Sequence, residues 1–303
     1  GRFELPTQSA SGWDRVLRAF DSMMGCVIEW IAAGLILIEV AILLTAVIAR
    51  YVLNTPLVFT DEVASLLFLW LAVLGAVIAF RRGEHMRMTA LVARLSPGGR
   101  AMADTLALAA SCVFLVLQVP AAFHYAQEEA AILTPALEIS AAWRAAALPV
   151  GLALMAVVSL LRLLRQGDWQ RLCLALVTVG LLCAVMTFLT PAWRELGQIN
   201  LLVFFVGITG LCVFAGVPIA VSFGWATMGF LALTTRLPLG VMIGRMEEGM
   251  SHVVLLSVPL FVFLGLFLGV FLIFLWAFQR SKQRGCGSCS RRRHHRGRSG
   301  RSG

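Results

Sequence analysis

The chain has 303 residues, of which 59% are hydrophobic and only 14% are charged. A soluble domain carries about 25% charged residues, so this composition excludes an ordinary soluble protein as well as the collagen-like, disordered and disulfide-scaffold classes. The formal charge of +9 arises in the last 24 residues, which hold nine basic residues and no acid; nucleic-acid binding by the chain as a whole is therefore not expected.

Long apolar stretches predict membrane-spanning helices, because a bilayer core of about 30 Å needs about 20 mostly apolar residues in helical form. Eight stretches meet or approach this length, and the chain is predicted to be an all-α, polytopic membrane protein with about eight transmembrane helices. In chain order the predicted spans are Met23–Ile48, Ala64–Phe80, Met102–Phe123, Ala141–Leu164, Leu172–Leu189, Ile199–Ala215, Val217–Leu233 and Val253–Phe278.

The distribution of arginine predicts the orientation, because cytoplasmic loops carry an excess of basic residues. With a cytoplasmic N-terminus, 11 of the 16 basic residues before the tail fall on the cytoplasmic side. The acids Glu128, Glu129 and Glu138 then fall outside. Eight spans return the basic tail to the cytoplasm, so both termini are predicted to be cytoplasmic.

Two connecting segments have the pattern of short amphipathic helices at the membrane surface. In the loop after the second span, Pro97 and the two glycines that follow are expected to end the first of them. The second follows the seventh span, with Arg245, Glu247 and Glu248 placed off its apolar face; an ordinary connector fits this pattern equally well. The apolar faces comprise Met88, Leu91, Val92 and Leu95 in the first segment, and Leu239, Met242, Ile243, Met246 and Met250 in the second.

Two acids, Glu29 and Glu39, fall inside the first span. A central acid costs about 2.5–3.5 kcal/mol on insertion scales, so it usually faces protein, water or a partner. A proton relay is one interpretation, but no second intramembrane charge forms a clear relay, and we expect a hydrogen bond to another span or subunit. Asp61 and Glu62 open the second span, where an acid suits the N-terminus of a helix.

Motifs of enzymes are absent from the sequence: there is no HExxH, GxSxG, P-loop or GxGxxG. Cys286 and Cys289 form a CxxC pair near two histidines, but in a Gly/Ser/Arg tail without a core, so no metal site is predicted. We expect neither enzyme activity nor a bound cofactor. An intramembrane enzyme that uses Glu29, Glu39 or His124 is the least favoured alternative.

The segment ARYVLNTPLVFTDEVASLLFLWLAVLGAVIAFRRGEHMRMTALVARLSP resembles the small membrane subunit of tripartite ATP-independent periplasmic (TRAP) transporters, the DctQ family. It shares an Arg-Tyr pair after the first span, a Glu at the start of the second, and a basic Gly-x-His loop. Phe59 stands where the family often has Trp. A second segment, from Thr134 to Gly151, resembles the start of the family's fourth span. The residues that match are Arg50, Tyr51, Glu62, Arg81, Arg82, Glu84, His85, Pro149 and Gly151.

The second half resembles the start of the family's large subunit, DctM, through a Gly-Val-Pro-Ile joint at Gly216 and Pro218 and a Pro-Leu-Phe span at Pro259. In this family, a small subunit can be joined through one extra span to a large one. The resemblance therefore implies a small-subunit domain at 1–166, a connecting helix at 167–196, an N-terminal fragment of a large subunit at 197–266, and a tail at 267–303.

The resemblance to the large subunit stops near Leu266. The chain continues as a Phe/Leu-rich stretch, which gives way to an Arg/Gly/Ser-rich one after Phe278. We expect a frameshift or truncation near this residue. The alternative is a genuine basic tail that binds anionic lipid, with about 1 kcal/mol for each basic residue near the surface.

The resemblance implies a bacterial inner-membrane component that takes up a small organic acid, a carboxylate of dicarboxylate-like size, from a periplasmic binding protein. Sodium would be the coupling ion, with its site outside this chain. The implied partners are membrane lipid, the rest of the large subunit and the binding protein. The matching residues would fix helices and interfaces, not catalyse. A membrane anchor for another partner, without transport, is the alternative function.

Overall fold

The computed structural model describes residues 12–55, 57–83, 96–166, 168–195, 197, 199–235, 237–251, 255, 257–274 and 276. These residues are mostly helical, and the β-structure among them is limited to an isolated bridge between Leu133 and Ser140. The chain divides into two compact units, Gly1–Val253 and Val254–Gly303. The predicted fold class, a polytopic helical membrane protein, is confirmed.

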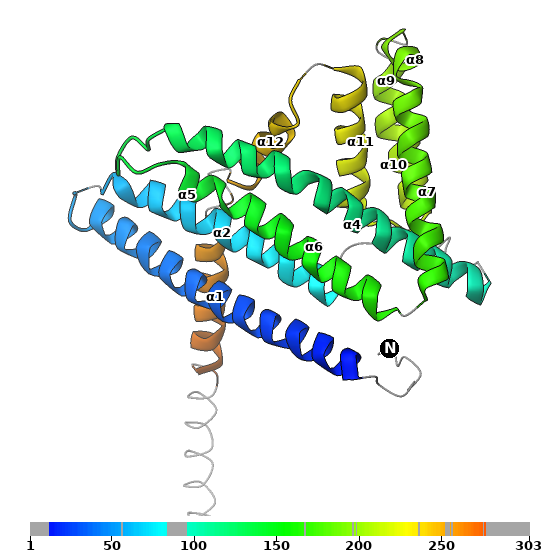
Figure 1. Ribbon diagram of the computed structural model, residues 1–303. Coiled ribbons are helices and arrows are strands. Elements are labelled where there is room, and N and C mark those ends of the chain that lie inside the picture. Colours follow the sequence, from blue (N-terminus) through cyan, green and yellow to red (C-terminus); the bar gives the residue numbers. More distant parts are fainter. Residues whose placement is uncertain are drawn as a thin grey trace, which may run out of the picture. The chain divides into compact units, whose positions relative to one another are not determined.

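The first unit contains the labelled helices of Figure 1. Its first half comprises α1 (Gly12–Tyr51), α2 (Phe59–Arg82), α4 (Pro97–Glu128), the short 3₁₀ helix η1 (Glu129–Ala131), α5 (Ala142–Ala145) and α6 (Ala147–Arg165). Its second half comprises α7 (Trp169–Phe188), α8 (Thr190–Glu195), α9 (Ile199–Leu202), η2 (Val203–Ile208), α10 (Thr209–Phe214), α11 (Ile219–Thr234) and α12 (Gly240–Met250).

Five helical segments are long and apolar enough to cross a membrane: Arg15–Tyr51, Phe59–Arg82, Pro97–Ala131, Ala142–Arg165 and Trp169–Phe188. Three shorter apolar helices, Ile199–Phe214, Ile219–Thr234 and Val258–Phe274, coincide with the other predicted spans. All eight predicted spans therefore correspond to helices among the described residues. The last helix, which starts one residue before Pro259, belongs to the second unit.

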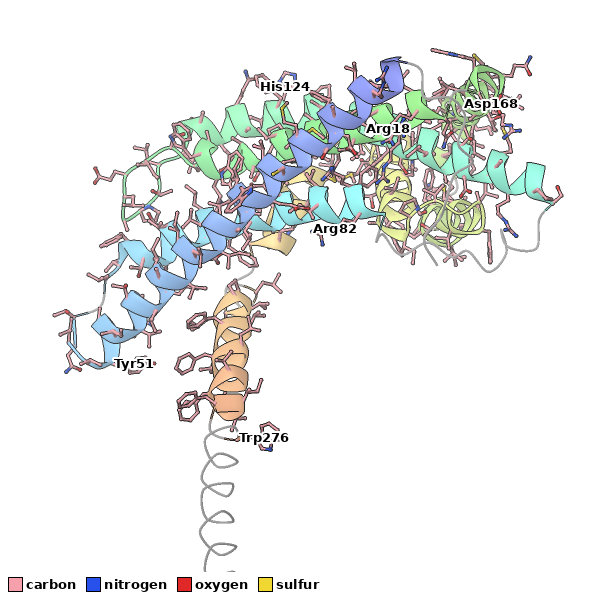
Figure 2. All side chains as sticks on the ribbon, turned by 90° about the horizontal axis from the view of Figure 1, so that it is seen from below. Arg18, Tyr51, Arg82, His124, Asp168 and Trp276 are labelled. Carbon is pink, nitrogen blue, oxygen red and sulfur yellow. The ribbon has the colours of Figure 1, made fainter. Side chains whose placement is uncertain are left out.

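Helix α1 is longer than a bilayer requires. Its 40 residues correspond to about 60 Å of α-helix, against a hydrocarbon core of about 30 Å. The helix therefore extends beyond the hydrocarbon core or crosses it at a steep tilt. Figure 2 places Arg18 and Tyr51 toward opposite ends of α1.

Helix α4 occupies the middle of the first unit and contacts α6, α7, α11 and α12. Its buried side chains are mostly small, including Ala107, Ala109 and Ala110, which lets neighbouring helices approach closely. The same principle acts between α2 and α6, where a Cβ added to Gly151 would lie 1.9 Å from Cγ1 of Val73. Small residues at these crossings thus determine how closely the helices pack.

Helix α4 begins five residues before the predicted start of the third span at Met102. Pro97 and the two glycines after it form its first turn, whereas the amphipathic segment predicted before them lies outside the described residues. Ser96 is the N-cap, and its Oγ accepts a hydrogen bond from the backbone N–H of Gly99 at 3.3 Å. Proline suits this first position because its missing N–H would have no partner inside the helix anyway.

The joint at Gly216 and Pro218 is a turn between two separate helices. Helix α10 ends at Phe214, Gly216 has a φ of 86°, and Pro218 is the N-cap of α11. Helix α11 contacts both α10 and η2, the π-helical segment before α10. Of the two interpretations of this joint, a hairpin and a broken helix, the structure shows the hairpin.

Candidate functional site: polar contacts between helices

Glu62, in the first turn of α2, holds the loop between η1 and α5. Its two carboxylate oxygens accept hydrogen bonds from the backbone N–H groups of Ala136, at 2.7 Å, and Leu137, at 3.0 Å. A hydrogen bond to an ionised carboxylate is stronger than one to a neutral acceptor. The side chain thus fixes a loop more than 70 residues away in the sequence.

A surface hollow lies beside this loop. Its polar lining includes Asp61, Glu62, Thr134, Ser140 and Arg144. The N–H of the Trp70 indole donates a hydrogen bond to the carbonyl oxygen of Trp143 at 3.0 Å, which joins α2 to α5 immediately before Arg144. Arg144, the next residue, lines the hollow.

Arg144 also forms an ion pair with Glu247 of α12, with 2.7 Å between Nε and Oε1. The Glu247 side chain is only 3% exposed, whereas that of Arg144 is 38% exposed. Glu247 interacts electrostatically with Tyr125 of α4 as well. A buried carboxylate of this kind needs such partners, because leaving a buried charge unpaired is costly.

Two further contacts attach α12 to α4. The side-chain amide of Gln118, which is fully buried, donates a hydrogen bond to the Met242 sulfur at 3.4 Å. The ring of Tyr125 lies against Gly244, where an added Cβ would be 3.3 Å from the ring. Ile243 is fully buried in the same core cluster. Helix α12 is thus packed along one face against α4, with further contacts to α2.

This packing corrects the expected position of Glu247. The sequence pattern placed Glu247 with Arg245 and Glu248, off the apolar face, but the structure buries it. The reason is helical geometry: Glu247 follows Ile243 by four residues, which is about one turn. Arg245 and Glu248 do lie exposed, paired with each other at 2.6 Å.

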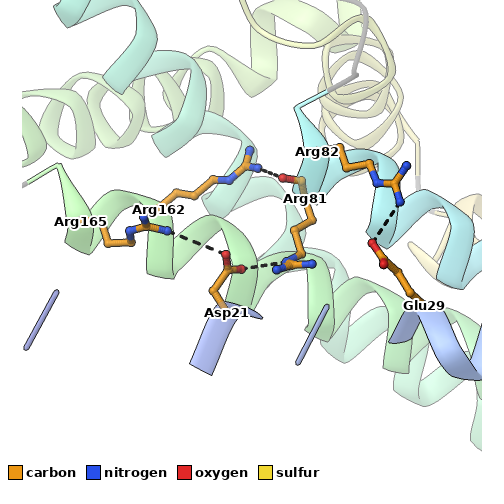
Figure 3. A network of polar contacts seen from close by, with 6 residues as sticks. All are labelled: Asp21, Glu29, Arg81, Arg82, Arg162 and Arg165. Atoms are coloured by element: carbon orange, nitrogen blue, oxygen red, sulfur yellow. Dashed lines mark hydrogen bonds and ion pairs between the residues drawn. The ribbon is translucent and has the colours of Figure 1, made fainter. Parts of the chain in front are cut away.

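A second polar network lies where α1, α2 and α6 meet, at the end of α2 predicted to be cytoplasmic (Figure 3). Asp21 pairs with Arg81 at 3.1 Å and with Arg165 at 3.8 Å. Glu29 pairs with Arg82 at 3.1 Å. Arg162 completes the network by donating to the backbone carbonyl of Arg81.

Gly25 makes room for this network. A Cβ at this position would lie 1.4 Å from Nη1 of Arg81. The guanidinium of Arg81 therefore lies directly against the α1 backbone, one turn after Asp21. Neither the glycine nor the aspartate stood out in the sequence as a site residue.

The other residues singled out from the sequence lie apart from these contacts or outside the described part of the chain. Arg50 and Tyr51 are exposed in the last turn of α1. Pro149 lies in the first turn of α6, where a helix tolerates proline. Glu39 is fully buried, and its carboxylate has no hydrogen-bond partner among the described residues. Glu84 and His85 lie outside the described residues.

Comparison with known protein families decides what this helical block is. Residues 39–168 match the family model of the DctQ component of the tripartite ATP-independent periplasmic transporters. The chain carries a TRAP-transporter DctQ component. The match covers α2, α4, α5 and α6 and most of the second half of α1. It therefore includes Glu62, Arg144 and all four arginines of the Asp21 network.

Three curated relatives agree with this assignment. The chain is 28% identical over 105 residues to a TRAP transporter small permease protein of Haemophilus influenzae. It is 28% identical over 123 residues to the sialic acid TRAP transporter small permease protein SiaQ of Vibrio cholerae, covering 71% of SiaQ. These relatives are permease proteins, not enzymes, and with the apolar helices they identify a multi-pass inner-membrane protein.

A longer relative extends the match beyond the small subunit. The sialic acid TRAP transporter permease protein SiaT of Haemophilus influenzae is 24% identical in an alignment of 265 positions that covers 78% of this chain. This alignment is twice as long as the DctQ match and supports a small subunit fused to further permease sequence. The chain spans 65% of the small permease of Haemophilus influenzae and 40% of SiaT.

Proposed function

We propose that this chain forms the scaffold, and the beginning of the large subunit, of a TRAP-type secondary transporter. The observation that supports this best is the docking of α12 on the DctQ component. Arg144 and Gln118 belong to the DctQ match, whereas Met242 and Glu247 lie beyond it. A buried ion pair and a buried hydrogen bond across this boundary would brace the following permease segment against the DctQ helices.

The substrate proposed is a small organic acid carried as its carboxylate. Two relatives bear names that refer to sialic acid, which belongs to this chemical class, and the resemblance to the DctQ and DctM families supports the same class. A periplasmic binding protein would deliver the acid, and a sodium gradient would drive its uptake. The sodium and substrate sites are proposed to lie in the remaining part of the DctM-like subunit, not in this chain.

Reconstitution of the chain in liposomes tests this proposal. The chain would be studied with and without the remaining large-subunit sequence and a periplasmic binding protein. We expect sodium-dependent uptake of a radiolabelled carboxylate only when all components are present. Uptake by the chain alone would contradict the division of roles. Absence of uptake by the complete set, together with capture of a different membrane partner, would favour the anchor function.

A further inference from the structure

We propose that the Asp21 network binds the headgroup phosphate of an anionic membrane phospholipid. This network consists of Asp21, Glu29, Arg81, Arg82, Arg162 and Arg165 (Figure 3). The inference goes beyond the proposed transport and does not depend on it.

The charges of the network do not balance. The ion-paired arginines Arg81, Arg82 and Arg165 outnumber their two carboxylate partners, Asp21 and Glu29, so these five side chains together carry a formal charge of +1. Asp21 is shared, with Arg81 on one of its oxygens and Arg165 on the other. An anionic group beside the network would offset this excess.

The guanidinium groups remain accessible at the surface. The side chains of Arg82 and Arg165 are 55% and 34% exposed. Both residues lie in the last turns of their helices, α2 and α6, where the chain is predicted to leave the membrane on the cytoplasmic side. Basic sites between helices at this depth suit lipid headgroups, and arginine suits phosphate because its planar fork can donate two parallel hydrogen bonds.

The apolar surroundings distinguish a phospholipid from free phosphate. The same stretch of α1 that supplies Asp21 and Glu29 exposes Val27 at 52% and Trp30 at 75%. Leu164, next to Arg165, is 42% exposed. A phospholipid offers both a phosphate for the arginines and acyl chains for these side chains, whereas inorganic phosphate offers only the first.

Binding of defined lipids to the full chain tests the inference. The purified chain, delipidated in detergent, would be titrated with phosphatidylglycerol and with phosphatidylcholine, and bound lipid counted by native mass spectrometry. We expect a preference for phosphatidylglycerol that inorganic phosphate does not abolish. Arg82→Gln with Arg165→Gln should weaken this binding about thirtyfold, from about fivefold for each basic residue. Arg245→Gln, on the exposed surface of α12, should leave it unchanged.

A substitution that adds to the excess charge covers the case in which the double variant does not fold. Glu29→Gln removes a half-exposed carboxylate from the network and should tighten phosphatidylglycerol binding several-fold. Equal binding of the two lipids, an unchanged affinity in both variants, or full competition by inorganic phosphate would each overturn the inference. An equal loss in Arg245→Gln would show a non-specific charge effect and overturn it too.

Discussion

Among the residues that the structure describes, two groups of ion pairs join helices, and they differ in exposure. The Asp21 network lies at the surface, with ion-paired side chains 21% to 55% exposed. The Arg144–Glu247 pair has one partner that is only 3% exposed. Exposed pairs contribute about 0–1 kcal/mol, whereas breaking a buried pair costs about 3–5 kcal/mol. The Arg144–Glu247 pair thus stabilises the fold, whereas the guanidinium groups of the Asp21 network stay accessible to an anionic ligand.

The largest effect is expected at the buried pair. Arg144→Met should leave the Glu247 carboxylate buried beside Tyr125 without its cation, at a cost of about 3 kcal/mol. This cost is at the low end of the range of about 3–5 kcal/mol for breaking a buried pair, because Arg144 is partly exposed. Thermal unfolding in detergent measures the loss. The control is Arg245→Met, whose side chain is 76% exposed; equal losses in the two variants would contradict the contrast in burial.

A double substitution separates the buried charge from the packing. Arg144→Met combined with Glu247→Leu removes both charges while keeping apolar volume at the contact. Replacing a buried ion pair with well-packed apolar groups is often neutral, so stability should return to within about 1 kcal/mol of the wild type. If the double variant unfolds at a lower temperature than Arg144→Met, the ion pair itself stabilises α12.

A smaller effect is expected from Gly25→Ala. The new Cβ would displace the end of the Arg81 side chain, which can swing away, so the loss is that of an exposed pair, about 0.5–1 kcal/mol. Gly34→Ala is the control on the same helix, because nothing lies within 4 Å of a Cβ there. Alanine favours helix over glycine by about 1 kcal/mol. Gly34→Ala should therefore be the more stable variant; the reverse order would contradict the packing at Gly25.

The smallest effect on stability is expected from Glu29→Gln. Its pair with Arg82 is exposed on both sides, so the free energy of unfolding should fall by at most about 0.5 kcal/mol. Raising the salt concentration should remove even this difference, because salt screens exposed charges. Unfolding is compared at low and high ionic strength. A loss that persists at high salt would mean that the pair is more shielded from solvent than its exposure indicates.

The sequence predicts the spans well and the contacts between them poorly. Apolar length is a local property, so each predicted span corresponds to a helix. Glu247 was misplaced because only the apolar side chains were used to define the face of α12. Its partner Arg144 lies on a different helix far away in the sequence, and no local pattern connects them. The first turn of α4 did carry a signal, a serine before a proline, which is typical of a helix start.

The Asp21 network shows a similar limit. Arg81 and Arg82 were recognised through the resemblance to the DctQ family, but Asp21, Gly25 and Arg165 were not. An aspartate before the first span looks like ordinary polar sequence until α1 and α2 are placed side by side. The roles proposed for Arg50, Tyr51, Glu84 and His85, and the domain limits, stay predictions.

The contact between Gln118 and Met242 also cannot form until long after Gln118 has been synthesised. The two residues are 124 positions apart, and synthesis at 5–20 residues per second needs about 6–25 s to cover that distance. During this interval α4 exists with its buried amide, and Arg144 with its charge, before α12 has been made. Early in the life of each molecule, these groups must be accommodated by water, lipid headgroups or the insertion machinery, and only the arrival of α12 completes the bundle.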